Sequence, residues 1–139
     1  MSAFKAVIIV LVVSLCAHAA AAVNVWATDK ACPVIKPAEV EIARVPFPPG
    51  WTVVVACNDV RWFLLQRKGD AQDTQHAFTN LKGQITVVRG AIFLPVIAVR
   101  PAHRVLLHEI GHIQCLCGDE WKAEAWAAGY ERREREDTR

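Results

Sequence analysis

The residues of this chain with the clearest chemistry form the pentapeptide His108-Glu109-Ile110-Gly111-His112. On a helix, residues four apart lie on one face, so both imidazoles can reach a single metal ion. Imidazole nitrogens bind zinc at about 2.0–2.1 Å, which suits this spacing. Glu109 is rotated about 100° from His108, where it can take a proton from a water molecule on the metal. The pattern therefore predicts a hydrolytic zinc site with Glu109 as general base.

The sequence around this motif predicts two helices. Pro101 suits the first turn of a helix, and Gly118 suits its end. Apolar residues recur between them at helical spacing: Val105, Leu106, Ile110, Ile113 and Leu116. Asp119 is a good N-cap for a second helix, running from residue 120 towards residue 133. Two histidines and a glutamate among apolar neighbours are costly to bury unless a ligand satisfies them, which favours a metal site over ordinary hydrogen-bonded histidines.

The residues before these helices predict a sheet. Three stretches are rich in β-branched or large apolar residues and predict strands: 51–57, 60–67 and 84–89. Asn58-Asp59 predicts a tight turn between the first two. Residues 91–99 are apolar but include Pro95, which cannot donate to a sheet ladder, so we expect an edge strand there. Strands followed by helices predict an α+β fold, with a small antiparallel sheet and exposed edge strand packed on the motif helix and the following C-terminal helix.

The N-terminal part of the chain predicts export. Residues 1–22 combine a positive charge, an apolar stretch over 6–17 and a small-residue cleavage site, as a signal peptide does. Residues 23–50 are rich in proline and predict an extended arm, with a brief helix near 38–43. We expect the folded domain to span residues 51–139.

The cysteines that follow the signal segment are Cys32, Cys57, Cys115 and Cys117. An even number of cysteines in an exported domain favours disulfides. Because Cys115 and Cys117 are two residues apart, a poor geometry for bonding each other on a helix, we expect each to pair with Cys32 or Cys57. Both crossed pairings remain open, and Cys32 is expected to hold the arm against the body.

With the motif and the edge strand in place, residues 91–129 resemble the zincin metallopeptidases. The resemblance implies that residues 91–99 pair with an extended peptide or protein substrate. The metzincin branch requires a glycine and a third histidine at the positions held here by Cys115 and Gly118. The gluzincin branch takes a glutamate from the following helix as its third ligand, with an acidic residue four positions later supporting the first histidine.

This gluzincin-like pattern implies Glu120 as the third ligand and Glu124 as the partner of His108. The short gap after His112, and a glutamate where aspartate is usual, leave the reverse assignment open. Cys115, seven residues after His108 on the same helix face, is an alternative ligand. Tyr130 is a candidate hydrogen-bond donor to the transition state.

The formal net charge is +2, which argues against a nucleic-acid partner. After removal of the signal segment we expect no membrane association, and the oligomeric state is not predicted. The sequence therefore predicts a secreted or periplasmic zinc metallopeptidase. The alternative is an exported binding module without catalysis, held together by zinc or by disulfides.

Overall fold

The computed structural model describes residues 22–69, 75–94 and 101–139, so residues 1–21 of the predicted signal segment lie outside the described residues. The described ranges confirm the α+β class. In chain order the elements are β1 (Asn24–Ala27), α2 (Ile35–Ala43), β2 (Thr52–Ala56), α3 (Asp59–Lys68), β3 (Ala77–Asn80), β4 (Ile85–Arg89), the 3-10 helix η1 (Gly90–Phe93), α4 (Ala102–Cys115) and α5 (Glu120–Asp137). Among the described helices, none has the length and apolar character needed to span a membrane.

The described strands form one mixed sheet in the order β1-β2-β4-β3. β1, β2 and β4 are parallel, and β3 is antiparallel to β4, so the prediction of an antiparallel sheet is wrong. The reason lies in the connections. Helix α2 joins β1 to β2, and a helical crossover of this kind returns the chain to the sheet in the same direction. After β2, helix α3 leads into β3, which runs in the opposite direction, and the turn after β3 makes β4 parallel to β2 again. β3 and β4 are joined by a short turn in which the Gly83 N–H donates to Asn80 Oδ1 at 2.9 Å, which allows antiparallel pairing.

Residues 60–67 form most of α3 instead of the predicted strand. Asn58 caps this helix, because its side-chain oxygen accepts a hydrogen bond from the Arg61 N–H at 3.0 Å. The expected turn at residues 58–59 is therefore the start of a helix. Trp62 and Gln66, four residues apart, form the buried side of α3. The large apolar residues of segment 60–67 favoured a strand in the sequence. In the structure some of them lie on this buried side of α3 and others on its exposed side.

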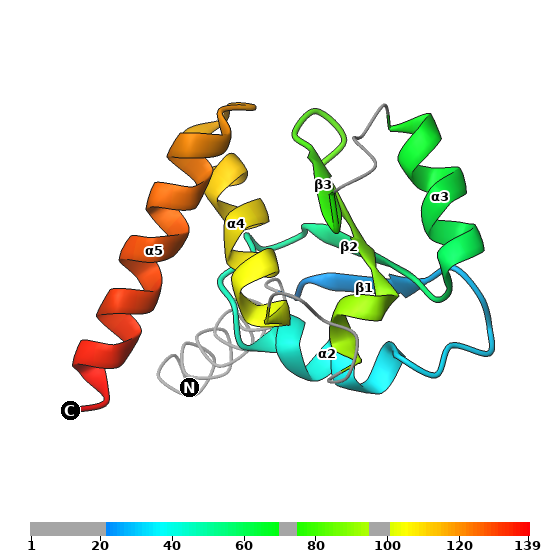
Figure 1. Ribbon diagram of the computed structural model, residues 1–139, viewed down its shortest axis with the longest axis horizontal. Coiled ribbons are helices and arrows are strands. Elements are labelled where there is room, and N and C mark those ends of the chain that lie inside the picture. Colours follow the sequence, from blue (N-terminus) through cyan, green and yellow to red (C-terminus); the bar gives the residue numbers. More distant parts are fainter. Residues whose placement is uncertain (1–21, 70–74, 95–100) are drawn as a thin grey trace, which may run out of the picture.

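Helices cover both faces of the sheet. On one face Val53 and Val55 belong to the core cluster that includes the buried sides of α2 and α4. On the other face Ala56 and Val87 pack with Trp62 of α3. Figure 1 shows α3 on the opposite side of the sheet from α4, with α5 lying along the outer side of α4. The motif helix α4 is therefore held between the sheet and α5.

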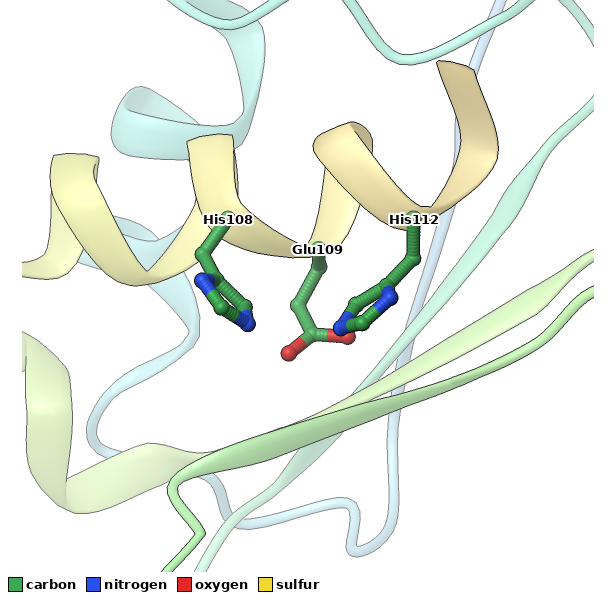
Figure 2. A group of neighbouring side chains, drawn as sticks. All are labelled: His108, Glu109 and His112. Atoms are coloured by element: carbon green, nitrogen blue, oxygen red, sulfur yellow. The ribbon is translucent and has the colours of Figure 1, made fainter. Parts of the chain in front are cut away.

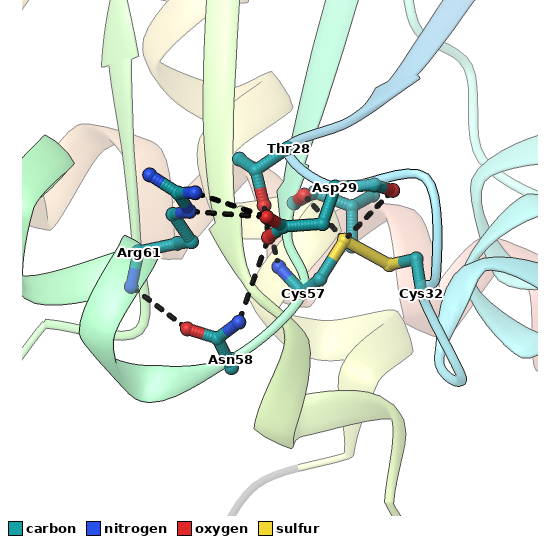
Figure 3. The surroundings of a disulfide bond; sticks show 7 residues. Thr28, Asp29, Cys32, Cys57, Asn58 and Arg61 are labelled. Atoms are coloured by element: carbon teal, nitrogen blue, oxygen red, sulfur yellow. Dashed lines mark hydrogen bonds and ion pairs between the residues drawn. A yellow bond between two sulfur atoms is a disulfide. The ribbon is translucent and has the colours of Figure 1, made fainter.

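Residues 23–50 contribute β1 and α2 to the fold, where the sequence predicts an extended arm with a brief helix near residues 38–43. Helix α2 includes that predicted helix. β1 pairs in parallel with β2, and Cys32 forms a disulfide with Cys57 at the end of β2. Figure 3 shows the polar contacts around this disulfide, in which Asp29 accepts from Arg61 and the Cys57 N–H donates to Thr28. The expectation that Cys32 fixes this segment to the body is confirmed.

The second disulfide joins Cys115 to Cys117, so the predicted crossed pairing is wrong. The physical reason is that α4 ends at Cys115 and the next residue, Leu116, adopts a left-handed conformation with φ of 50°. The chain leaves the helical path at this point, so the two side chains no longer point to opposite sides of a helix. The Cα atoms lie 5.2 Å apart, within the usual range for a disulfide. The objection to pairing two residues apart applies to a continuing helix, and the helix does not continue.

The described edge strand beside α4 is β3, whereas the sequence predicts residues 91–99. Gly90–Phe93 forms η1, whose Ile92 and Phe93 side chains are buried in the core, and residues 95–100 lie outside the described residues. Gly90 permits this close packing, because a Cβ there would lie 2.4 Å from the carbonyl oxygen of Ala56. β3 pairs with β4 and contacts α4. Its four residues therefore form one border of the sheet and pack against the motif helix.

Candidate metal centre

Helix α4 carries the His-Glu-x-x-His motif in the predicted helical conformation. His108 and His112 project from one side of the helix with Glu109 between them (Figure 2). The imidazole centroids are 5.0 Å apart and the rings are nearly perpendicular, at 79°. One ligand atom from each of these three residues lies within 4.8 Å of the others. This spacing could hold a metal ion.

Each imidazole has a hydrogen-bond acceptor at its Nδ1 atom. His112 Nδ1 lies 3.0 Å from the Cys117 carbonyl oxygen, and His108 Nδ1 lies 2.7 Å from Glu124 Oε2. A carbonyl oxygen can only accept, so His112 Nδ1 donates to it, and Nε2 is the ring nitrogen left to face a metal. An ionised Glu124 has the same effect on His108. Hydrogen bonds of this kind fix the ring orientation and tautomer of metal-binding histidines.

The Glu120 carboxylate lies against the Nε2 atoms of both histidines. Its Oε2 is 2.7 Å from His108 Nε2, and its Oε1 is 3.3 Å from His112 Nε2. Asp119 starts α5 as predicted, since its side chain accepts a hydrogen bond from the Lys122 N–H and places Glu120 in the first turn. The two acidic residues of α5 therefore have different positions. Glu120 meets the Nε2 side of the imidazoles, and Glu124 meets the Nδ1 side of His108.

Glu109 is buried beneath the two imidazoles. Its Oε2 accepts a hydrogen bond from Thr79 Oγ1 at 2.7 Å. Burial raises the pKa of Glu109, and the Thr79 hydrogen bond and the two histidines oppose that rise. A carboxyl group with a raised pKa in a partly apolar pocket is typical of a group that exchanges protons during catalysis.

A pocket with a volume of about 220 Å³ opens beside this cluster. Glu109, His112 and Glu120 line one part of it, and the β3 region lines another through Phe78, Thr79 and Leu81. Two of the candidate metal ligands, His112 and Glu120, therefore border a space that a small group could enter. A purely structural zinc site is typically closed by four protein ligands.

Two residues that contribute to this geometry were missed by sequence reasoning. Arg104 donates to Glu124 Oε1 at 2.8 Å and lies 3.0 Å from Glu131 Oε2, so it fixes the acid that contacts His108. Its position four residues before His108 is the signal that could have found it. Gly111 allows α4 and α5 to approach closely, because a Cβ at this position would lie 2.4 Å from the Ala123 carbonyl oxygen.

Two other sequence candidates are not brought into the cluster. The sulfur of Cys115 is bonded to Cys117, so this residue offers no thiolate to a metal. Tyr130 stacks on Trp126 with ring centroids 5.3 Å apart, and Arg133 lies over its ring. Tyr130 is ten residues after Glu120, which corresponds to about 15 Å along the helix axis. A hydrogen bond from its phenol to a substrate at the motif is therefore not supported.

No protein-family model matches this chain, and neither the curated proteins nor the solved structures contain a significant match. The chemistry of the site is therefore argued from its own geometry. His108, Glu109 and His112 could hold a metal ion, and the Glu120 carboxylate and a pocket lie beside them.

Proposed function

We propose that this protein is a zinc-dependent peptide hydrolase in which His108, His112 and Glu120 hold the metal. The observation that carries the proposal is the arrangement of the two imidazoles. Each Nδ1 atom is satisfied by an acceptor, and both Nε2 atoms face the same carboxylate. Hydrogen-bonded histidines with a purely structural role have no need for this convergence on one point.

The contacts favour Glu120 over Glu124 as the third ligand. Glu120 reaches the Nε2 atoms of both histidines, whereas Glu124 contacts His108 at Nδ1 and also accepts from Arg104. A carboxylate held by a guanidinium on one oxygen and an imidazole N–H on the other has few lone pairs left for a metal. Glu124 is thus suited to orienting His108, which is the role that the gluzincin resemblance implies.

When bound at these ligands, zinc would polarise a substrate carbonyl and lower the pKa of a water molecule towards 7. Glu109 would take the proton from the attacking water and transfer it to the leaving amine. The burial of Glu109 keeps competing water away from this proton. β3 replaces residues 91–99 as the strand proposed to pair with an extended substrate, because it lies at a border of the sheet and its residues line the pocket.

We also propose that the protein works outside the cytosol, in a secreted or periplasmic setting. Its two disulfides support this proposal, because such bonds form and persist in oxidising compartments.

The test of the proposed function combines zinc analysis with peptide hydrolysis. The purified protein should contain one zinc ion per chain, and Glu120→Ala should weaken zinc binding more than a hundredfold. Glu124→Gln should weaken it by about 10–100-fold and keep the stoichiometry. Glu136→Ala changes an exposed glutamate near the end of α5 and serves as the matched control, with no change expected.

Glu109→Gln should retain zinc and lose hydrolysis of a fluorogenic peptide library by at least a thousandfold. Substantial activity in that variant would overturn the mechanism. Zinc binding without hydrolysis of any peptide would instead indicate a zinc-held binding module. A protein that binds no zinc and unfolds in reductant would be a disulfide-held module.

A further inference from the structure

A chain of hydrogen bonds, buried at Trp51 and Thr86 and partly buried at Thr79, runs through the sheet and ends on Glu109. The Trp51 indole Nε1–H donates to Thr86 Oγ1 at 3.0 Å. Thr86 Oγ1 lies 3.0 Å from Thr79 Oγ1, and Thr79 Oγ1 lies 2.7 Å from Glu109 Oε2. Trp51 and Glu109 are each 5% exposed, and Thr86 is fully buried. These hydrogen bonds connect Trp51, the residue before β2, with β4, β3 and α4.

The direction of every hydrogen bond in this chain is fixed by its ends. An indole N–H can only donate, and an ionised carboxylate can only accept. Thr79 gives its proton to Glu109, so Thr86 must give its proton to Thr79. Each hydroxyl hydrogen therefore has one direction, from Thr86 to Thr79 and from Thr79 to Glu109, and neither hydroxyl can reverse its hydrogen bond. Hydrogen bonds aligned in this way strengthen one another inside a protein.

The two threonines stand at positions where the same face of the sheet is otherwise apolar. Thr79 is paired in register with Thr86, and the next pair on that face is Ala77 with Val88. Ala77 and Val88 are both buried in the core. Valine has nearly the shape of threonine and avoids the cost of burying a hydroxyl group. Thr79 is half-buried beside the pocket, but Thr86 is fully buried in this apolar layer, so its hydroxyl needs an explanation that packing does not supply.

We propose that Trp51, Thr86 and Thr79 are positioning residues for Glu109, an inference that rests on the proposed hydrolytic function. Thr79 occupies Oε2 and fixes the rotation of the carboxylate, so Oε1 is the oxygen that accepts the proton from the attacking water. This series of hydrogen bonds also holds Glu109 against Thr79 of β3, Thr86 of β4 and Trp51, the residue before β2. The base consequently keeps its place relative to β3, where the substrate is proposed to pair.

The experiment compares Thr79→Val, which removes the hydroxyl, with Thr79→Ser, which retains it. In the zinc-loaded protein, Thr79→Val should lower kcat for peptide hydrolysis at least tenfold and leave KM and the zinc Kd within twofold of wild type. Thr79→Ser should restore most of the lost kcat. Thr52→Val is the matched control, because Thr52 is a half-buried threonine of β2 outside this chain. It should leave kcat unchanged. A kcat within twofold of wild type in both Thr79→Val and Thr86→Val, with zinc content intact, would overturn the proposal.

A second measurement does not depend on activity. The Trp51 indole N–H signal, assigned with Trp51→Phe, is followed by 15N–1H NMR in the purified protein. Glu109→Leu removes the terminal acceptor and should shift this signal, although two hydroxyl groups separate the residues. Glu109→Gln retains an acceptor oxygen and should shift it less. An unmoved signal in Glu109→Leu and Thr79→Val would show that no connected chain exists. If the signal moves but wild type hydrolyses no peptide, the proposed function fails while the ordering of Glu109 stands.

Discussion

Replacing Gly111 by alanine tests whether the close contact between α4 and α5 determines the metal site. A Cβ at residue 111 would lie 2.4 Å from the carbonyl oxygen of Ala123 and 2.7 Å from its Cα. Both are backbone atoms of α5, so no flexible side chain can move aside. Ordinary contact requires about 3.5 Å or more, so α5 must move away by about 1 Å. Overpacking of this kind costs about 1–3 kcal/mol.

The same displacement should weaken zinc binding. Glu120 lies on α5, whereas His108 and His112 lie on α4, so a shift between the helices changes the distances within the ligand set. Zinc sites hold their ligand distances to within about 0.2 Å. A displacement of about 1 Å would therefore remove Glu120 from the proposed coordination. We expect the zinc Kd of Gly111→Ala to rise at least tenfold.

Gly129→Ala is the matched control on α5. A Cβ there would meet only the end of the Arg133 side chain, at 3.5 Å. Alanine is a better helix former than glycine by about 1 kcal/mol, so this variant should be slightly more stable than wild type. The assays are urea unfolding in the presence of a chelator and zinc competition with a chromophoric chelator. If Gly111→Ala matches wild type in both stability and zinc Kd, the helix contact does not control the site.

Three further outcomes follow from burial and from the two disulfides. Burial raises the pKa of Glu109, so the folded protein binds more protons than the unfolded chain between the ordinary and the raised pKa. In chelator, stability should therefore fall as pH rises through that interval, and Glu109→Gln should remove this fall in urea titrations repeated at several pH values. A steeper fall in the variant would contradict the sign. Replacing Cys32 and Cys57 by serine opens a link across 25 residues and should cost roughly 3 kcal/mol in urea unfolding under oxidising conditions. Replacing Cys115 and Cys117 by serine removes a link across only two residues, so it should leave unfolding nearly unchanged while weakening zinc binding measurably by competition. Equal losses of stability in the two double variants would refute this distinction.

The sequence by itself determined the parts of the protein that depend on neighbours along the chain. The helical spacing of apolar residues predicted α4, and Asp119 predicted the start of α5. The i, i+4 spacing placed His108 and His112 on one side of a helix. These predictions succeeded because helix formation and capping are governed by contacts within three or four residues.

The tertiary structure decided everything that depends on residues far apart in sequence. The sequence did not show that residues 60–67 form a helix, because their strand-like composition is outweighed by the packing of Trp62 against Ala56 and Val87 of the sheet. Parallel pairing of β1, β2 and β4 follows from where the crossover helices pack, which no local pattern encodes. Which side of the imidazoles Glu120 and Glu124 contact depends on how closely Gly111 lets the two helices approach. The link from Thr79 to Glu109 spans 30 residues and exists only because the sheet brings β3 against α4.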